Sequence, residues 1–177
     1  MNQLSRLIHR LVEIQIKLCN RLLLILGVAM TLLILLQVFF RFVIYVPFPW
    51  SEECARYLMI WMGMLGSVIA LQQGRHIGVT FFMEKLSPGL QKPARGLTQT
   101  GMILFLGILC WQGILFSLFN ADQISPALEI PMIIPFGAIP VGALMMILVM
   151  LAEMLDLFFP DSEGPGTVSR QTREATP

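Results

Sequence analysis

The chain has 177 residues, of which 56% are hydrophobic and 13% are charged, and its mean hydropathy is +0.75. Soluble domains are on average about 45–50% apolar and about 25% charged, so the composition excludes an ordinary soluble enzyme. The formal net charge of +1 gives no basic excess for binding nucleic acid. The length is that of one domain, which we expect over residues 1–160.

An amphipathic helix is predicted for residues 3–20. Apolar residues recur there at spacings of three and four, with charged residues at most other positions: Leu4, Leu7, Leu11, Ile14 and Leu18. An apolar stripe opposite a cationic face is typical of a helix that lies in the membrane interface or packs on a partner. The alternative is that this segment continues the first membrane span as one long helix.

Four long apolar runs predict four membrane-spanning helices, because backbone N–H and C=O groups in lipid must be paired within the protein. The first run, residues 22–40, would extend about 28 Å, close to the hydrocarbon thickness of roughly 30 Å. It is too long for a signal peptide and lacks a small-residue cleavage site, so we expect it to be retained. With their polar ends, the spans are expected at residues 22–44, 54–72, 97–119 and 132–157.

Lysine and arginine are distributed unevenly between the two sides of these spans. Ten belong to the N-terminal segment, the loop between the second and third spans, and the C-terminal tail, against two on the other side, Arg41 and Arg56. The excess predicts that both termini are cytoplasmic and that residues 42–53 and 120–131 face outward. The tail, residues 161–177, is predicted to be disordered, and a short helix is expected near residues 79–86.

The predicted spans contain no ionisable side chain at mid-depth, where ion-coupled transporters usually carry one. Gln37 and Gln112 are expected to hydrogen bond between helices. Neither histidine falls in an apolar run, and the three cysteines form no CxxC motif, so haem and structural zinc have no support. The chain is not expected to be an enzyme, and no catalytic, substrate-binding or metal site and no cofactor is predicted.

Small residues and prolines mark positions for helix packing. Gly63, Gly66 and Gly113 belong to small-xxx-small steps, which let helices approach closely, either within this chain or against a partner. Pro135 and Pro140 predict a kinked outer half of the fourth span, because proline removes a backbone donor. The kink either lets the helix pack in a bent form within this chain or shapes a surface for a partner.

The densest polar group of the sequence lies between the first two spans and consists of Arg41, Trp50, Ser51, Glu52, Glu53 and Arg56. Ser51 is expected to be the N-cap of the second span, and the helix dipole favours both glutamates in the first turn. Each glutamate can pair with Arg56 along the helix or neutralise Arg41. This corner is therefore either structural or a contact for another protein.

At these residues the chain resembles a known family, the small (Q-type, or DctQ) membrane subunit of tripartite ATP-independent periplasmic (TRAP) transporters. The resemblance covers about residues 20–155 and departs from the family pattern at Thr80, where an aspartate is common. The matching residues are Arg41, Trp50-Ser51-Glu52-Glu53, Ala55-Arg56, Trp61, Gly66, His76-Ile77, Ser125-Pro126-Ala127-Leu128, Ile130-Pro131 and Ile139-Pro140-Val141-Gly142.

The resemblance implies a scaffold subunit in the bacterial inner membrane. Its partners would be the lipid bilayer, a large membrane subunit that holds substrate and sodium, and a periplasmic binding protein, with an organic acid such as a C4-dicarboxylate or sialic acid as cargo. The alternative is a self-contained four-span protein, such as a small exporter or the anchor of a membrane enzyme, although the intramembrane carboxylate or histidines that these need are missing.

Overall fold

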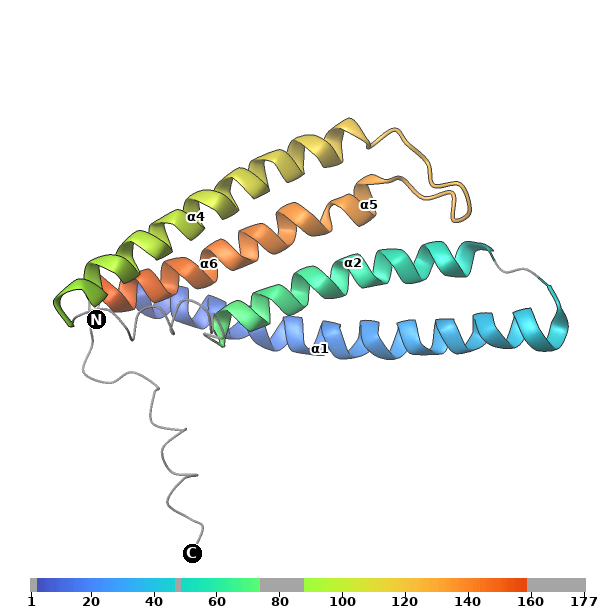
Figure 1. The fold of residues 1–177 in the computed structure, drawn as a ribbon, viewed down its shortest axis with the longest axis horizontal. Helices are drawn as coiled ribbons and strands as arrows, with labels where there is room; N and C mark the ends of the chain where they lie inside the picture. Colours follow the sequence, from blue (N-terminus) through green and yellow to red (C-terminus); the bar gives the residue numbers. More distant parts are fainter. Residues whose placement is uncertain (1–2, 47–48, 74–87, 159–177) are drawn as a thin grey trace, which may run out of the picture.

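The computed structural model describes residues 3–46, 49–73 and 88–158. Within these ranges the fold is entirely helical, as predicted, and four helices are long and apolar enough to cross a membrane. The expected helix near residues 79–86 and the tail from residue 161 lie outside the described residues. The elements shown in Figure 1 are α1 (Gln3–Phe39), the π-helix η1 (Phe40–Ile44), α2 (Pro49–Gln72), α4 (Pro88–Phe119), α5 (Ile133–Phe136) and α6 (Ala138–Phe158).

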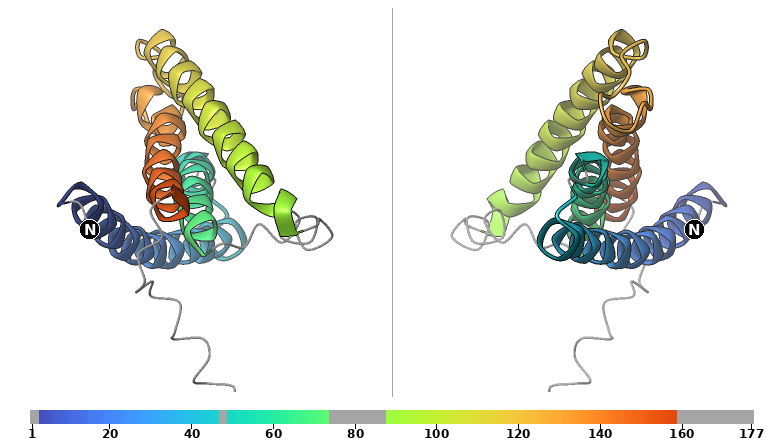
Figure 2. Two further views of the ribbon diagram at one scale, coloured as in Figure 1. Left: turned by 90° about the vertical axis from the view of Figure 1, so that its left-hand side faces the viewer. Right: turned by 90° about the vertical axis from the view of Figure 1, so that its right-hand side faces the viewer.

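The N-terminal segment and the first span form one continuous helix. The 37 residues of α1 extend about 55 Å, well beyond the roughly 30 Å of a hydrocarbon layer. Because no helix-breaking residue separates the two segments, the long-helix alternative is the one observed. Figure 2 shows that α1 curves, and this curvature carries its N-terminal part from α2 toward α6.

The N-terminal part of α1 packs on α6 through a different face from its leucine stripe. Gln15 Nε2 donates to the carbonyl oxygen of Met145 (3.0 Å), and the adjacent Val12 and Cys19 are buried. The leucine stripe of this segment stays about half exposed: Leu7, Leu11, Ile14 and Leu18. The stripe is therefore left for lipid or for another protein.

The helices form an open row in the order α4, α6, α2, α1. Among the described helices, α4 packs only against α6 and α5, whereas α2 packs against α1, α5 and α6. Figure 2 shows α4 splayed away from α2, so the row does not close into a bundle. The buried core lies along the middle of the row, and its members on the central helices α2 and α6 are Leu65, Val68, Ile69, Leu71, Met146, Val149, Met150 and Ala152.

The fourth span is interrupted where its prolines predict a kink. Pro140 lacks the N–H that would bond the carbonyl of Phe136, and its ring crowds that carbonyl, so a regular helix cannot continue through this point. The chain ends α5 at Phe136 and begins α6 at Ala138. Gly137 bridges the two, since its N–H donates to the carbonyl of Ile133 (2.8 Å).

The three glycines expected to pack helices behave differently. A Cβ at Gly113 would lie 3.1 Å from Pro140 Cδ, so this glycine allows the close approach of α4 to α6. A Cβ at Gly66 would meet Leu23 of α1 at an ordinary 3.9 Å. Gly63 packs on none of the other described helices of this chain, because it is exposed and nothing lies within 4 Å of a Cβ placed there, so contact with a partner stays a prediction.

The tightest helix contact involves Gly142, which the sequence did not single out for packing. A Cβ on Gly142 would lie 2.9 Å from Met64 Cβ, which cannot swing aside as a side-chain end can. We expect Gly142→Ala to lower the free energy of unfolding by about 1–3 kcal/mol through overpacking of α6 on α2. The measurement is reversible unfolding in detergent micelles.

Gly63→Ala is the matched control for this change. Its methyl group meets open space, and alanine is favoured over glycine in a helix by roughly 0.5–1 kcal/mol, so stability should be unchanged or higher. Equal stability of the two variants would contradict the packing described for α2 and α6.

Candidate functional site at the loop end of the helices

The polar groups of interest gather at one end of the helix row, which we call the loop end. It consists of η1, the start of α2 and residues 120–132, which connect α4 to α5. Figure 1 shows these three segments at the same end of the molecule, beyond the tips of α4 and α5. A buried carboxylate at the start of α2 joins the second segment to the third.

That carboxylate is Glu53, whose side chain is buried. Its Oε2 accepts hydrogen bonds from the backbone N–H groups of Ala127 (2.9 Å) and Leu128 (3.0 Å). Its Oε1 accepts one from the hydroxyl of Tyr57, one helical turn further along α2. Glu53 thus receives three donors and binds a loop more than 70 residues away in sequence.

The loop that Glu53 binds is a single tight turn. The N–H of Glu129 donates to the carbonyl of Ser125 (3.2 Å), and the N–H of Ser125 donates to the carbonyl of Ile130 (2.9 Å). Glu129 has a left-handed φ of 54°, which reverses the chain before Pro131 pairs with Ile124 in an isolated β-bridge. The turn carries its N–H groups toward α2 and leaves Ile124 and Glu129 exposed.

Glu53 acts as an N-cap for the turn at residues 125–129, although it belongs to the helix α2. The first N–H groups of any helical turn have no acceptor within the turn, and a carboxylate is the side chain that satisfies them best. Pro126 suits the first position, where no N–H is needed, and Ala127 and Leu128 carry the two free donors. Ser125 is buried beside Glu53 and Tyr57, although its Oγ makes no hydrogen bond of good geometry.

Glu52 and Arg41 do not form the ion pair that the sequence predicts. Glu52 instead accepts a hydrogen bond from Gln37 Nε2 of α1 (3.2 Å), which confirms the expected helix-to-helix bond of Gln37. The exposed guanidinium of Arg41 lies 5.8 Å from the ring centroid of its neighbour Phe42. Glu53 does not pair with Arg41 either, because it binds the backbone of the loop. Arg41 itself belongs to the π-helix η1, whose wider turns change the direction of its side chain relative to α1.

Two further expectations for the start of α2 change in the structure. Ser51 is buried but is not an N-cap, because α2 begins two residues earlier at Pro49. Trp50 is 37% exposed. Arg56 is exposed and forms no ion pair with either glutamate among the described residues. Within the predicted corner, Glu53 is the residue that hydrogen bonds the backbone of the 120–132 loop.

Tyr57 is the functional neighbour that sequence reasoning missed. Its hydroxyl bonds Glu53 and also approaches Met132 Sδ (3.4 Å), just before α5. A tyrosine four residues after a carboxylate lies on the same helical face, so the i,i+4 spacing was the available signal. The spacing points to a bond between Tyr57 and Glu53 in particular only when the position of the loop is known.

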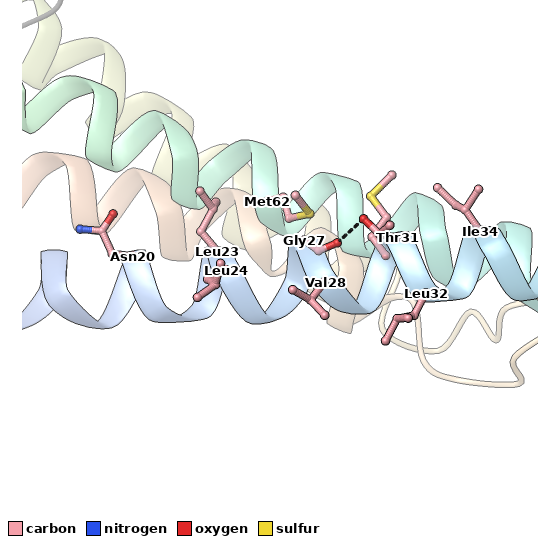
Figure 3. A pocket seen from close by; sticks show the side chains of 10 residues that line it. Asn20, Leu23, Leu24, Gly27, Val28, Thr31, Leu32, Ile34 and Met62 are labelled. Carbon is pink, nitrogen blue, oxygen red and sulfur yellow. Dashed lines mark hydrogen bonds between the residues drawn. The ribbon is translucent and has the colours of Figure 1, made fainter.

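A second feature is an apolar groove of about 720 Å³ along α1. Figure 3 shows Gly27, Thr31 and Met62 on its wall, with the Thr31 hydroxyl turned back onto the carbonyl of Gly27 (2.8 Å). Its other lining residues are mostly aliphatic. The groove therefore offers no charged group that could bind an ionic substrate.

Comparison with known proteins identifies the family. The family model described as "Tripartite ATP-independent periplasmic transporters, DctQ component" matches residues 30–159. The chain belongs to the DctQ family. It is therefore a small permease subunit of a TRAP transporter and a multi-pass protein of the bacterial inner membrane. This membership replaces the alternative of a self-contained exporter or enzyme anchor.

Individual relatives agree with the family match. A putative TRAP transporter small permease protein of Haemophilus influenzae is 24% identical over 159 residues, which cover 90% of this chain and 94% of that protein. The C4-dicarboxylate TRAP transporter small permease protein DctQ of Rhodobacter capsulatus is 30% identical over 99 residues, 55% of this chain and 44% of that protein. The sialic acid TRAP transporter small permease protein SiaQ of Vibrio cholerae is 40% identical over 50 residues, 28% of this chain and 29% of that protein.

The Glu53 contact explains how two stretches that carry the family resemblance belong together. The stretch at residues 50–56 supplies the carboxylate, and the stretch at residues 125–131 supplies the turn that it binds. Neither stretch forms this contact alone.

The hydroxyl of Tyr57 can be tested separately from the carboxylate. We expect Tyr57→Phe to lower the free energy of unfolding in detergent by about 1 kcal/mol, the usual value of one hydrogen bond, because Glu53 loses a donor. The control is Tyr45→Phe at a side chain that is 82% exposed, where the change should stay within about 0.5 kcal/mol. Equal effects of the two changes would argue against the contact.

Proposed function

We propose that this DctQ-family chain is the static scaffold subunit of a sodium-driven TRAP transporter that imports an organic acid. In this proposal a large membrane subunit holds the substrate and the sodium ions, and a periplasmic binding protein delivers the substrate. The chain itself holds no cofactor. The names of relatives support an organic acid, since they include C4-dicarboxylate and sialic acid transporters.

One observation carries the scaffold role: the buried carboxylate already has its partners within the chain. Glu53 accepts three hydrogen bonds from the protein, so its charge is stabilised by internal donors and holds a loop in place. The hydroxyl groups within the spans are likewise turned back onto carbonyls of their own helices: Thr31 onto Gly27, Ser67 onto Gly63 and Ser117 onto Gly113. These hydroxyl groups donate within the chain, and the charged residues of α2 and α6, such as Glu53 and Glu153, lie toward helix ends and not at mid-depth.

The open helix row supports an association with a larger membrane protein. In the most hydrophobic window of α1 no residue is buried, and in those of α2 and α4 only 17% are, so wide apolar faces remain available. Membrane helices associate by close packing rather than by hydrophobic exclusion, and exposed small residues such as Gly63 and Ser67 permit it. We propose that one of these faces meets the large subunit and that lipid covers the others.

The uneven distribution of lysine and arginine supports an orientation with the loop end in the periplasm and both termini in the cytoplasm. Single-cysteine labelling tests this orientation after the three native cysteines are replaced by alanine. In intact cells, an impermeant maleimide should label Asp122→Cys on the exposed loop and should label Glu13→Cys on α1 only after permeabilisation. The reverse pattern would refute the orientation.

Reconstitution tests the scaffold role. Liposomes that contain this chain together with its large subunit should accumulate the organic acid when the binding protein and an inward sodium gradient are supplied. Liposomes with this chain alone should accumulate none, because its spans carry no charged group at mid-depth. Uptake by the chain alone, or full uptake by the large subunit without it, would overturn the proposal.

A further inference from the structure

We propose that Glu53 is a positioning residue that sets the shape of the 120–132 loop for contact with the periplasmic binding protein. The proposal rests on the function proposed above, since it requires that the loop end face the periplasm. It adds a specific mechanism, because the start of one membrane helix determines the form of an exposed loop between two others.

The first argument is that the turn cannot satisfy its own backbone. Its internal hydrogen bonds use the N–H groups of Ser125 and Glu129, whereas those of Ala127 and Leu128 point to Glu53. Free donors at the start of a turn cost stability unless an acceptor is supplied. The turn is therefore held in this shape by a residue of α2.

The second argument is that the site favours a carboxylate over a neutral side chain of the same size. Three groups donate hydrogen bonds to Glu53: the hydroxyl of Tyr57 and the two N–H groups of the turn. In a glutamine the amide oxygen is uncharged, so the bonds to the turn lose their charge assistance, and the NH₂ group meets Tyr57, whose hydroxyl must turn its proton away. Glu53→Gln therefore keeps the volume and weakens the bonds that hold the turn.

The third argument concerns the two faces of the loop. Its inner face is fixed, because Ser125 and Asn120 are buried. Its outer face is bare, since Ile124 is 66% exposed and Glu129 and Pro131 are also exposed. A surface held in its bound shape before contact binds at a lower entropic cost than a flexible loop. In the proposed orientation the protein that meets this face is the soluble binding protein.

The experiment is a titration of the binding protein into liposomes that hold the assembled transporter, at saturating substrate and a fixed sodium gradient. For Glu53→Gln we expect the half-saturating concentration of binding protein to rise roughly tenfold, which corresponds to about 1.4 kcal/mol. The maximal rate, divided by the amount of assembled complex, should stay within about twofold. The control is Glu13→Gln, the same chemical change at an exposed carboxylate on α1, which should leave both quantities unchanged.

A purely structural role for Glu53 would give a different pattern. The amount of complex or the maximal rate would fall while the half-saturating concentration stayed the same, and that result would overturn the inference. A Glu53→Gln transporter with the same half-saturating concentration of binding protein as the wild type would overturn the inference too. If the wild-type transporter worked without any binding protein, the proposed function would fail first.

A measurement on the isolated chain keeps the inference testable apart from transport. A nitroxide attached at Asp122→Cys, with the native cysteines replaced by alanine, reports the mobility of the loop. Glu53→Gln should make the loop more mobile and so narrow the lines of the electron paramagnetic resonance spectrum. Tyr57→Phe should narrow these lines less, because both backbone bonds remain, and Glu13→Gln should leave them unchanged. An unchanged spectrum for Glu53→Gln would show that the carboxylate does not hold the loop.

Discussion

Backbone N–H groups that lack an acceptor cost stability where water cannot reach them, and at the loop end one buried carboxylate accepts from two of them. The turn at residues 125–129 leaves two N–H groups without an internal acceptor, and Glu53 accepts from both. The path of the chain from α4 to α5 depends on this contact. So does the position of the loop over α2, because Tyr57 lies under the same carboxylate and reaches Met132.

The rest of the architecture is organised around α6. Gly142 admits Met64 of α2 on one side, and Gly113 of α4 admits Pro140 on the other, so α6 is held between two close contacts. The interruption at Gly137 lets the outer part of the fourth span take its own direction above these contacts. The helices α1 and α4 remain on the rim of the row, and their apolar surfaces are left to lipid and to other subunits.

The sequence predicts the helices well because a bilayer leaves a chain few other choices, and it places the break near Pro140 because proline has no N–H to donate. Side-chain partners were harder to predict. The charges of Arg41 and Glu53 make an ion pair plausible, yet backbone donors from a distant loop take the carboxylate. Ser51 has the chemistry of an N-cap, but Pro49 starts the helix earlier. The partner of Glu53 was missed because the sequence does not reveal where a distant backbone lies, and the role of Ser51 was missed because the exact first residue of a helix is hard to predict.

The distribution of polar contacts also bears on what a small subunit of this kind contributes. Hydroxyl groups in the spans bond carbonyls one turn back on their own helices, and Gln15 and Gln37 bond neighbouring helices. Each of these bonds uses its donor inside the chain and so fixes the geometry of the helices. In the scaffold role proposed above, such a subunit acts on transport through the shape and position of its surfaces. The Glu53 contact ties one exposed surface, the 120–132 loop, to the membrane helices.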